Sequence, residues 1–280
     1  MKRLFVAALV ALALAVVSVP ARASNIALTG HDDDFHCGGG FGDPNACAQL
    51  AALITYARNG SALPVLTFDA GSELTSYLTH AGIAFTNVNP NTAGAVTASL
   101  FSNSLYSAFI VASDTTCGGC DNSAAGEAAI AAQGAAIDDF LNGGGGIVGL
   151  AGANSANYYA FVPQTATSVG GAPSSGYSQT GVGATLGIPD VNGDATHNLF
   201  FNPGTNGESA FYQIAEVNLT SGNGVIPAPA AVTLVCTGCT VSGGTIVGGG
   251  GAVTPEPSTL LLLGTGLTGF AGLVRRRLAH

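Results

Sequence analysis

The sequence has few charged residues and almost no basic ones outside its two ends. Charged residues make up 8% of the chain, whereas an average soluble domain contains about 25%. Residues 24–254 contain one basic residue, Arg58, against fifteen acidic ones, a formal charge of −14. Binding to a phosphate backbone needs clusters of Lys and Arg, so this distribution excludes nucleic-acid binding and favours cation binding. Hydrophobic residues reach 47%, which excludes wholesale disorder.

The first 23 residues have the pattern of a secretory signal peptide. A basic start, Lys2-Arg3, precedes an apolar run at 4–19 and the small-x-small sequence Ala21-Arg22-Ala23. Signal peptidase cuts after such a sequence, which makes Ser24 the expected first residue of the mature protein. The alternative interpretation is an N-terminal membrane anchor that is retained.

A second apolar segment lies near the C-terminus. Pro255-Glu256-Pro257 precedes a Leu- and Gly-rich stretch at 258–274, which is followed directly by Arg275-Arg276-Arg277. As a helix, this stretch reaches about 25 Å at ~1.5 Å per residue, just enough for a thin bilayer. The arginines hold their end on the cytoplasmic side. The pattern therefore predicts a transient inner-membrane anchor with the body of the protein outside.

Residues 254–278 resemble the PEP-CTERM sorting signal in motif, apolar span, basic cluster and position. The resemblance implies that exosortase, a membrane cysteine protease, recognises 254–280 and cuts near Pro-Glu-Pro. It also implies a bacterium with an outer membrane and an exopolysaccharide system. The chain is then an inner-membrane intermediate that passes to the periplasm, cell surface or extracellular matrix. A plain tail anchor is the alternative.

Residues 24–218 predict one α/β domain with a doubly wound parallel sheet. Short apolar runs, of which the fourth lacks a polar face, alternate with segments of helical periodicity. The expected strands are 25–29, 64–68, 84–88, 107–112 and 147–150, and the expected helices are 44–58, 73–81 and 130–141. This alternation favours a flavodoxin-like, doubly wound sheet.

The alternation ends near residue 165, and no helix is expected beyond it. Gly, Ser, Pro and Thr dominate the following segment. We expect residues 219–253 to form a Gly-rich extension with a β-hairpin at 232–241 and a flexible linker at 243–251.

Polar residues follow the first, fourth and fifth expected strands, where ligands bind in open parallel sheets. The first cluster is rich in carboxylate and imidazole groups, which predicts a site for Ca²⁺ or Mg²⁺, or with imidazole ligands for Zn²⁺ or Mn²⁺. The alternative is a solvated acidic loop that caps the next helix. The candidate metal ligands are His31, Asp32, Asp33, Asp34 and His36.

The glycine-rich strand at 144–151 and the order of the elements resemble the class I glutamine amidotransferase-like superfamily, most closely its ThuA-like branch. The resemblance covers residues 25–200. It implies a nucleophilic Cys or a His directly after this strand, where this chain has Ala151. Nucleophilic chemistry needs a thiol, hydroxyl or imidazole there, which argues against an enzyme. His197, in a segment that resembles the branch's downstream histidine region, and Asp114 are the remaining catalytic candidates.

Six cysteines occur as three local pairs, and an exported protein with an even number of cysteines favours disulfides. Fifteen connectivities are possible, of which sequence proximity favours the three local bridges. A Cys₄ zinc site from the two C-x₂-C pairs and a redox role for the middle pair are the alternatives. The pairs are Cys37 with Cys47, Cys117 with Cys120, and Cys236 with Cys239.

Together, these features predict an exported surface or matrix protein that is non-catalytic and binds divalent cations. Calcium or a similar ion would link its carboxylates to exopolysaccharide or other envelope components. The alternative is a secreted metal-dependent hydrolase of the ThuA-like superfamily, acting on envelope carbohydrate or amide bonds. Such an enzyme would place the 31–36 loop, Asp114 and His197 around a metal ion.

Overall fold

The computed structural model describes residues 24–38, 42–114, 122–152, 158–164, 166, 168–193, 197–206, 208–220 and 224–249. These residues lie in one compact unit, 22–250. The predicted signal peptide and sorting tail, including the apolar span 258–274, lie outside the described residues. In the part of the chain that is described, no helix is long and apolar enough to cross a membrane.

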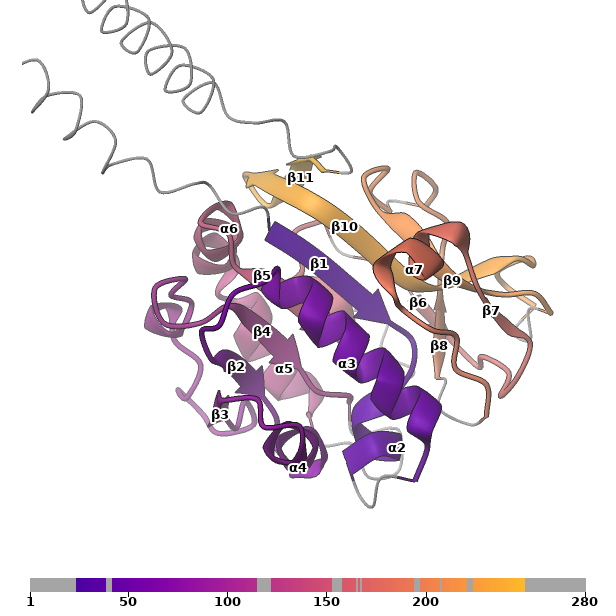
Figure 1. Cartoon of the computed structure of the whole chain (residues 1–280). Helices are drawn as coiled ribbons and strands as arrows, with labels where there is room; N and C mark the ends of the chain where they lie inside the picture. The colour runs from indigo at the N-terminus through magenta and orange to yellow at the C-terminus, as the bar shows by residue number, and fades with distance from the viewer. Residues whose placement is uncertain are drawn as a thin grey trace, which may run out of the picture. The chain divides into compact units, whose positions relative to one another are not determined.

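Five parallel strands form the first half of the sheet, each within one residue of its predicted bounds. They are β1 (Ser24–Thr29), β2 (Val65–Phe68), β3 (Phe85–Val88), β4 (Ala108–Val111) and β5 (Gly146–Gly149), in the spatial order β3-β2-β4-β5-β1 (Figure 1). The α/β prediction is thus confirmed. The flavodoxin order is 2-1-3-4-5. This sheet would show that order only if β2 were numbered as the first strand and β1 as the fifth. In chain order, therefore, the flavodoxin-like topology is not found.

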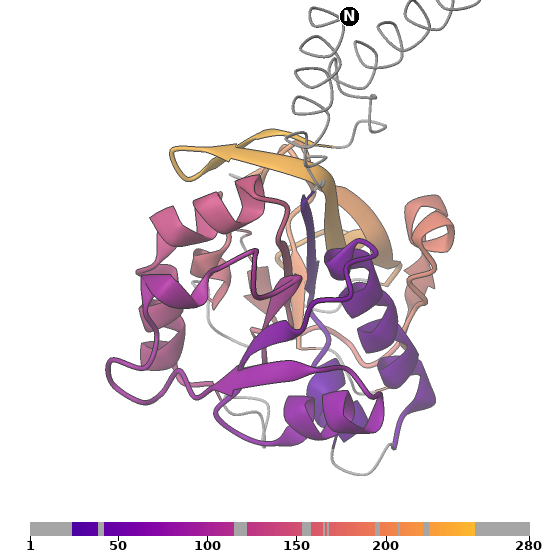
Figure 2. The same ribbon diagram turned by 60° about the vertical axis from the view of Figure 1, so that its left-hand side comes forward.

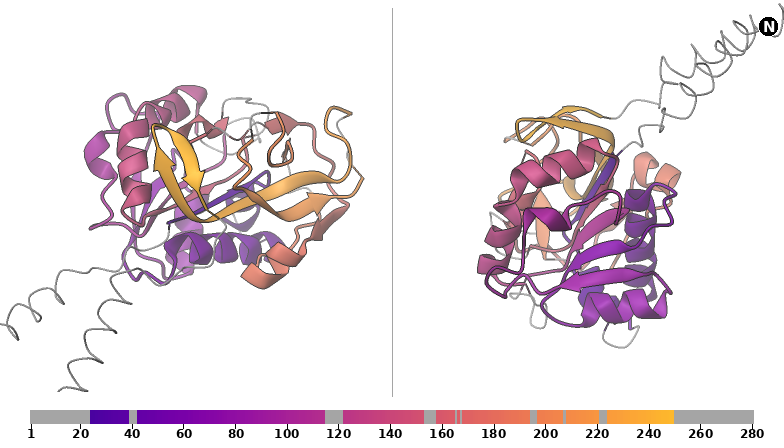
Figure 3. Two further views of the ribbon diagram at one scale, coloured as in Figure 1. Left: turned by 90° about the horizontal axis from the view of Figure 1, so that it is seen from above. Right: turned by 90° about the vertical axis from the view of Figure 1, so that its left-hand side faces the viewer.

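Helices cover both faces of this sheet. One face carries α3 (Pro44–Arg58) and α4 (Glu73–His80); the other carries α5 (Ala124–Ala131) and α6 (Gly134–Asn142). Figure 2 and the right panel of Figure 3 show the sheet between these two layers. The single helix expected at 130–141 is in fact two helices, because the chain leaves the helical path at Gln133, where φ is −93° and ψ is 18°.

Alternating side chains divide the sheet between two hydrophobic cores. Ile26 and Leu28 of β1 pack in the core under α5 and α6, whereas Ala27 packs in the core under α3 and α4. Successive strand side chains point to opposite faces, so a strand covered on both faces needs apolar residues throughout. Helix α3 begins where predicted, because the Asp43 carboxylate caps it by accepting a hydrogen bond from the Asn45 N–H at 2.8 Å.

The C-terminal half differs most from the prediction. Residues 232–241 are not a hairpin but the middle of one long strand, β10 (Ala230–Ser242), which pairs antiparallel with β1 inside the main sheet. The hairpin turn lies later, at Gly243 and Gly244, whose φ angles of +60° and +75° suit glycine. It leads into β11 (Thr245–Gly248), so part of the predicted linker is a strand. Residues 230–248 therefore belong to the domain and not to an extension.

The remaining elements are short, and the four strands among them complete the sheet around β10. A helix occurs after residue 165, where none was expected, and another one forms in the acidic loop after β1. They are α2 (Asp33–Gly38), η1 (Ala98–Leu100), η3 (Tyr158–Phe161), β6 (Ser168–Gly170), β7 (Tyr177–Gln179), α7 (Gly181–Leu186), β8 (Asn198–Phe200) and β9 (Gln213–Asn218).

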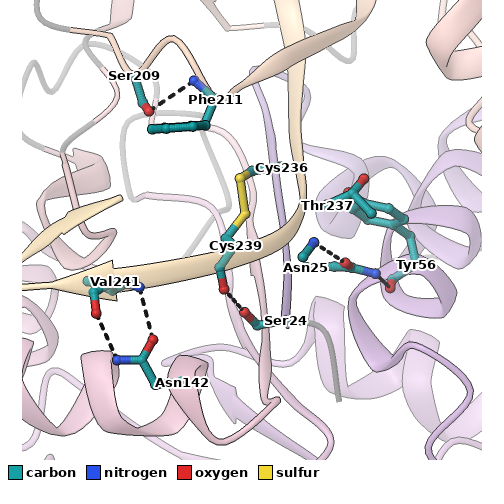
Figure 4. The surroundings of a disulfide bond; sticks show 11 residues. Ser24, Asn25, Tyr56, Asn142, Ser209, Phe211, Cys236, Thr237, Cys239 and Val241 are labelled. Atoms are coloured by element: carbon teal, nitrogen blue, oxygen red, sulfur yellow. Dashed lines mark hydrogen bonds between the residues drawn. A yellow bond between two sulfur atoms is a disulfide. The ribbon is translucent and has the colours of Figure 1, made fainter. Parts of the chain in front are cut away.

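Two of the three expected disulfides are present. Cys37 and Cys47 link α2 to α3 with their Cα atoms 4.9 Å apart, and Cys236 and Cys239 bridge a segment of β10 at 5.9 Å (Figure 4). No cysteine of the described residues is free. The Cys₄ zinc alternative is therefore wrong, because two of its four thiols are oxidised. Cys117 and Cys120 lie outside the described residues.

Candidate functional site

Some of the polar residues predicted at the carboxyl end of the sheet meet around the end of β1, whereas residues 153–157, after β5, lie outside the described residues. The N–H groups of His197 and Asn198 both donate hydrogen bonds to the Gly30 carbonyl oxygen, at 2.8 and 3.3 Å. A Cβ atom at Gly30 would overlap the Asn198 carbonyl group, so only glycine allows this approach. The contact brings the chain before β8 against the loop after β1, although 165 residues separate His197 from Asp32.

His197 and His36 share one buried carboxylate. His197 Nε2 lies 2.9 Å from Asp32 Oδ2, and His36 Nε2 lies 3.5 Å from Asp32 Oδ1. The Asp32 side chain is fully buried, whereas the imidazoles of His197 and His36 are 28% and 20% exposed. The hydrogen bond to Asp32 raises the pKa of His197, against the effect of burial, and Asp114 adds a smaller electrostatic effect in the same direction. The arrangement can hold a proton on a partly exposed imidazole.

His31 points away from this group and into a buried polar network. Its Nε2 donates to Glu216 Oε2 at 2.8 Å, and the same oxygen accepts from Gln49 at 3.0 Å and from Thr233 at 2.8 Å. Glu216 Oε1 accepts from the Val191 N–H at 2.8 Å. Burial alone would raise the pKa of Glu216, but these donors together lower it, so the carboxylate is ionised. We call these five residues the Glu216 network.

Sequence reasoning missed Glu216, although the sequence carried a signal for it. Glu216 is the one charged residue of β9, and it lies between Ala215 and Val217. A charged residue at a buried strand position needs a partner. Which partner could not be read from the sequence, because His31 is 185 positions away.

Asp33 and Asp34 occupy separate positions in the first turn of α2. The Asp34 carboxylate accepts hydrogen bonds from the Ser113 N–H at 2.8 Å and from the Ser113 hydroxyl at 2.5 Å. Burial raises the pKa of Asp34 to about 7 and the pKa of Asp33 well above its usual range. Neither carboxylate oxygen of Asp33 has a hydrogen-bond partner among the described residues.

Asp114 and Glu127 form a second acidic pair, at the end of β4 and in α5. Both are buried, and the Asp114 N–H donates to the Ala151 carbonyl oxygen at 3.1 Å. Burial raises the pKa of Glu127 to about 9, with a further contribution from Asp114. Glu127 is therefore a neutral acid at pH 7. Ala151 itself is fully buried and carries no nucleophilic group.

Asn122, which sequence reasoning did not single out, joins the ends of β2 and β4. Its side-chain nitrogen donates to the carbonyl oxygens of Phe68 and Ala112 at 2.8 and 3.1 Å, and its Oδ1 accepts from the Ala70 N–H at 3.1 Å. From β2 the chain runs outward to β3, and from β4 it runs to β5 on the other side. Asn122 thus fixes the point where the strand order reverses, the usual ligand position in open α/β sheets.

The five candidate metal ligands do not point to one centre. His31 faces Glu216, Asp32 faces His197 and Asp34 faces Ser113. Among the residues that the structure describes, no three His, Cys, Asp or Glu side chains are arranged to hold a metal ion. The divalent-cation site stays a prediction from the sequence.

Comparison with known proteins identifies the tail. A family model for the PEP-CTERM protein-sorting motif matches residues 253–277. No curated protein and no solved structure matches the chain. The match supports an exported protein that exosortase sorts, and it confirms the resemblance of the C-terminal segment. The ThuA-like resemblance of the body finds no support, since no relative or structural neighbour carries it.

Proposed function

We propose that the protein is an exported component of the cell surface or extracellular matrix, matured by removal of its signal peptide and its tail. The PEP-CTERM motif at 253–277 carries the proposal. The position of the motif also fits processing, because the last described strand, β11, ends at Gly248. Loss of the tail removes no strand or helix of the described domain.

Processing is tested by the intact mass of the protein in a host with exosortase and in the same host without it. With the enzyme, we expect a soluble product that begins at Ser24 and lacks the apolar segment. Without it, the tail is retained and the chain fractionates with the inner membrane. Glu256→Gln is a matched variant, because it removes the charge of the motif and leaves its size. An unchanged C-terminus in both hosts would refute the proposal.

For the mature body we propose a non-catalytic, cation-dependent role in the envelope. The formal charge of −14 over residues 24–254 supports it, because divalent cations bridge polyanions to acidic polysaccharide. Calorimetric titration with Ca²⁺ and the melting temperature with and without Ca²⁺ test this role. If the titration gives no heat and the melting temperature does not change, the cation-dependent role is wrong.

A second candidate function, a secreted hydrolase, is favoured by the contact between His197 and Asp32. A buried carboxylate that orients a partly exposed imidazole is a common arrangement for proton transfer, and Asp114 lies close enough to affect the same imidazole. The test is incubation with purified envelope polysaccharide and peptide cross-links, with and without added metal, followed by assay of new reducing ends and amines. Release by the native protein, and its loss in His197→Gln, would favour the enzyme. No release with either protein would eliminate it.

A further inference from the structure

The first residues of the expected mature protein are buried in the sheet. Ser24 and Asn25 are 2% and 5% exposed. The Ser24 hydroxyl donates to the Cys239 carbonyl oxygen, and Asn25 Nδ2 donates to the Tyr56 carbonyl oxygen at 2.8 Å. Asn25 Oδ1 accepts from the Gly238 N–H at 3.1 Å. Figure 4 shows these contacts next to the disulfide of β10.

The strand that covers Ser24 comes almost last in the chain. Cys239 stands 215 positions after Ser24, so β10 leaves the ribosome and crosses the membrane long after β1. Until then, the amino end of β1 lacks its β10 partner. Once β10 has paired, Ser24 and Asn25 are held by main-chain pairing on that side and by their side-chain bonds.

Proteases bind the residues on both sides of the cut bond as an extended strand, through main-chain hydrogen bonds. For the expected cut after Ala23, the residues on the C-terminal side are Ser24 and Asn25. We propose that signal peptidase has to cut before β1 closes on β10, so that a folded chain with its leader attached is a poor substrate. This ordering rests on the proposed export.

The C-terminal cut lies beyond the described strands. Gly249, the last described residue, passes close to the disulfide, where a Cβ atom would lie 2.7 Å from Cys236 Sγ. The sorting motif begins at residue 253, beyond the last described strand. Exosortase can therefore act on a folded domain, and the order of maturation becomes leader cleavage, closure of β1 on β10, then tail removal at any later time.

The test uses the full-length chain in detergent micelles with purified signal peptidase. One sample is refolded with its disulfides formed, and the other is reduced, unfolded in urea and diluted directly into the enzyme. The readout is the rate at which a new N-terminus appears at Ser24, followed by intact mass. We expect cleavage of the refolded chain to be at least about 100-fold slower, because only its locally opened form is cut.

A Gly-Ser-Gly-Ser insertion between Ala23 and Ser24 is the matched control. It keeps the recognised sequence Ala21-Arg22-Ala23 and moves the cut bond about 13 Å away from β1. The refolded insertion variant should be cut within about threefold of the unfolded rate. Equal rates for the refolded native and insertion chains, whether both fast or both slow, would overturn the ordering. If even the unfolded native chain is not cut before Ser24, the predicted leader cleavage fails as well, which separates the two failures.

Discussion

Replacing Glu216 by glutamine removes the acceptor at the centre of the Glu216 network. Glu216 Oε2 accepts from three side chains, and Oε1 accepts from the Val191 N–H. An amide nitrogen donates hydrogen bonds and does not accept them. Whichever way the new amide is turned, its NH₂ group faces at least one of these donors.

The expected loss of stability is large. A hydrogen bond to a charged group contributes about 1.5–3 kcal/mol, and a buried donor left without an acceptor costs about 1–3 kcal/mol. We therefore expect Glu216→Gln to lower the free energy of unfolding by about 3–5 kcal/mol at pH 7. For a domain of this size, 1 kcal/mol corresponds to about 2–4 °C, so the melting temperature should fall by roughly 6–20 °C.

The pH dependence gives a second check on the same variant. The folded state lowers the pKa of Glu216 below its ordinary value of 4.5. The stabilisation is therefore fully present above about pH 4.5 and is lost as the pH falls through the lower pKa of the folded state. The difference between native protein and variant should accordingly be largest at neutral pH and should shrink below pH 4.5.

Urea unfolding followed by far-UV circular dichroism measures both effects, since the chain has no Trp for fluorescence. Gln213→Glu is the control, because Gln213 lies at the exposed end of the same strand, β9. That change should stay within about ±0.5 kcal/mol. A loss of less than about 1 kcal/mol for Glu216→Gln at pH 7 would refute the view that these bonds are shielded from water.

Four further changes test single positions by urea unfolding or by melting temperature. Gly30→Ala should lower the free energy of unfolding by about 1–3 kcal/mol or more, because its Cβ would overlap the Asn198 carbonyl group. Gly134→Ala in α6 is the control: its Cβ would point into open space, and it should raise the free energy of unfolding by about 0.4–1 kcal/mol. Equal effects of the two changes would contradict the close contact at Gly30. Asn122→Ala removes three hydrogen bonds across the end of the sheet and should cost about 2–4 kcal/mol, and a neutral result would mean that water replaces them. In the native protein, burial raises the pKa of Glu127 to about 9, so its carboxyl group destabilises the fold increasingly as the pH rises above the pKa of the unfolded chain. Glu127→Gln removes this effect, and its melting temperature should therefore rise relative to that of the native protein between pH 5 and pH 8. A constant difference across this range would refute the burial of that group.

Local sequence signals predicted the first half of the fold well. Helix α3 had its cap, its apolar spacing and its stop in one short segment, with Asp43 before it and Asn59 after it. Strands β1, β2, β4 and β5 were recognisable because both of their faces are covered, whereas β3, at the edge of the sheet, is partly exposed. Such signals need no knowledge of distant parts of the chain.

The position of the hairpin illustrates why the second half was harder. Residues 232–241 contain Gly238, which suggests a turn, and its φ of +65° does suit glycine. In the structure Gly238 instead lies at a β-bulge, where the register between β1 and β10 shifts, and the Cys236–Cys239 disulfide spans it. A bulge and a turn need the same residue type, so composition alone does not separate them.

The sequence predicted the position of the candidate site in the fold more accurately than the contacts within it. His197 and Asp114 do lie with the loop after β1, as ligand positions in parallel sheets suggest. The contacts among these polar residues were not predictable, because residues that are neighbours in the sequence form hydrogen bonds with different and distant parts of the chain. His31 binds Glu216 and Asp32 binds His197, although the sequence presents both as members of one metal-binding run.

The place of β1 links maturation to the candidate site. Strand β1 lies between β5 and β10, which fixes the position of its first residue, Ser24. Gly249, the last described residue, lies at the same end of β1, beside the disulfide. The last residue of β1, Thr29, leads directly to His31 and the polar cluster. A six-residue strand spans about 17 Å, so Ser24 and Gly249 lie at one end of β1 and the polar residues at the other. We therefore expect the proposed removal of leader and tail to leave the hydrogen bonds of the candidate site unchanged.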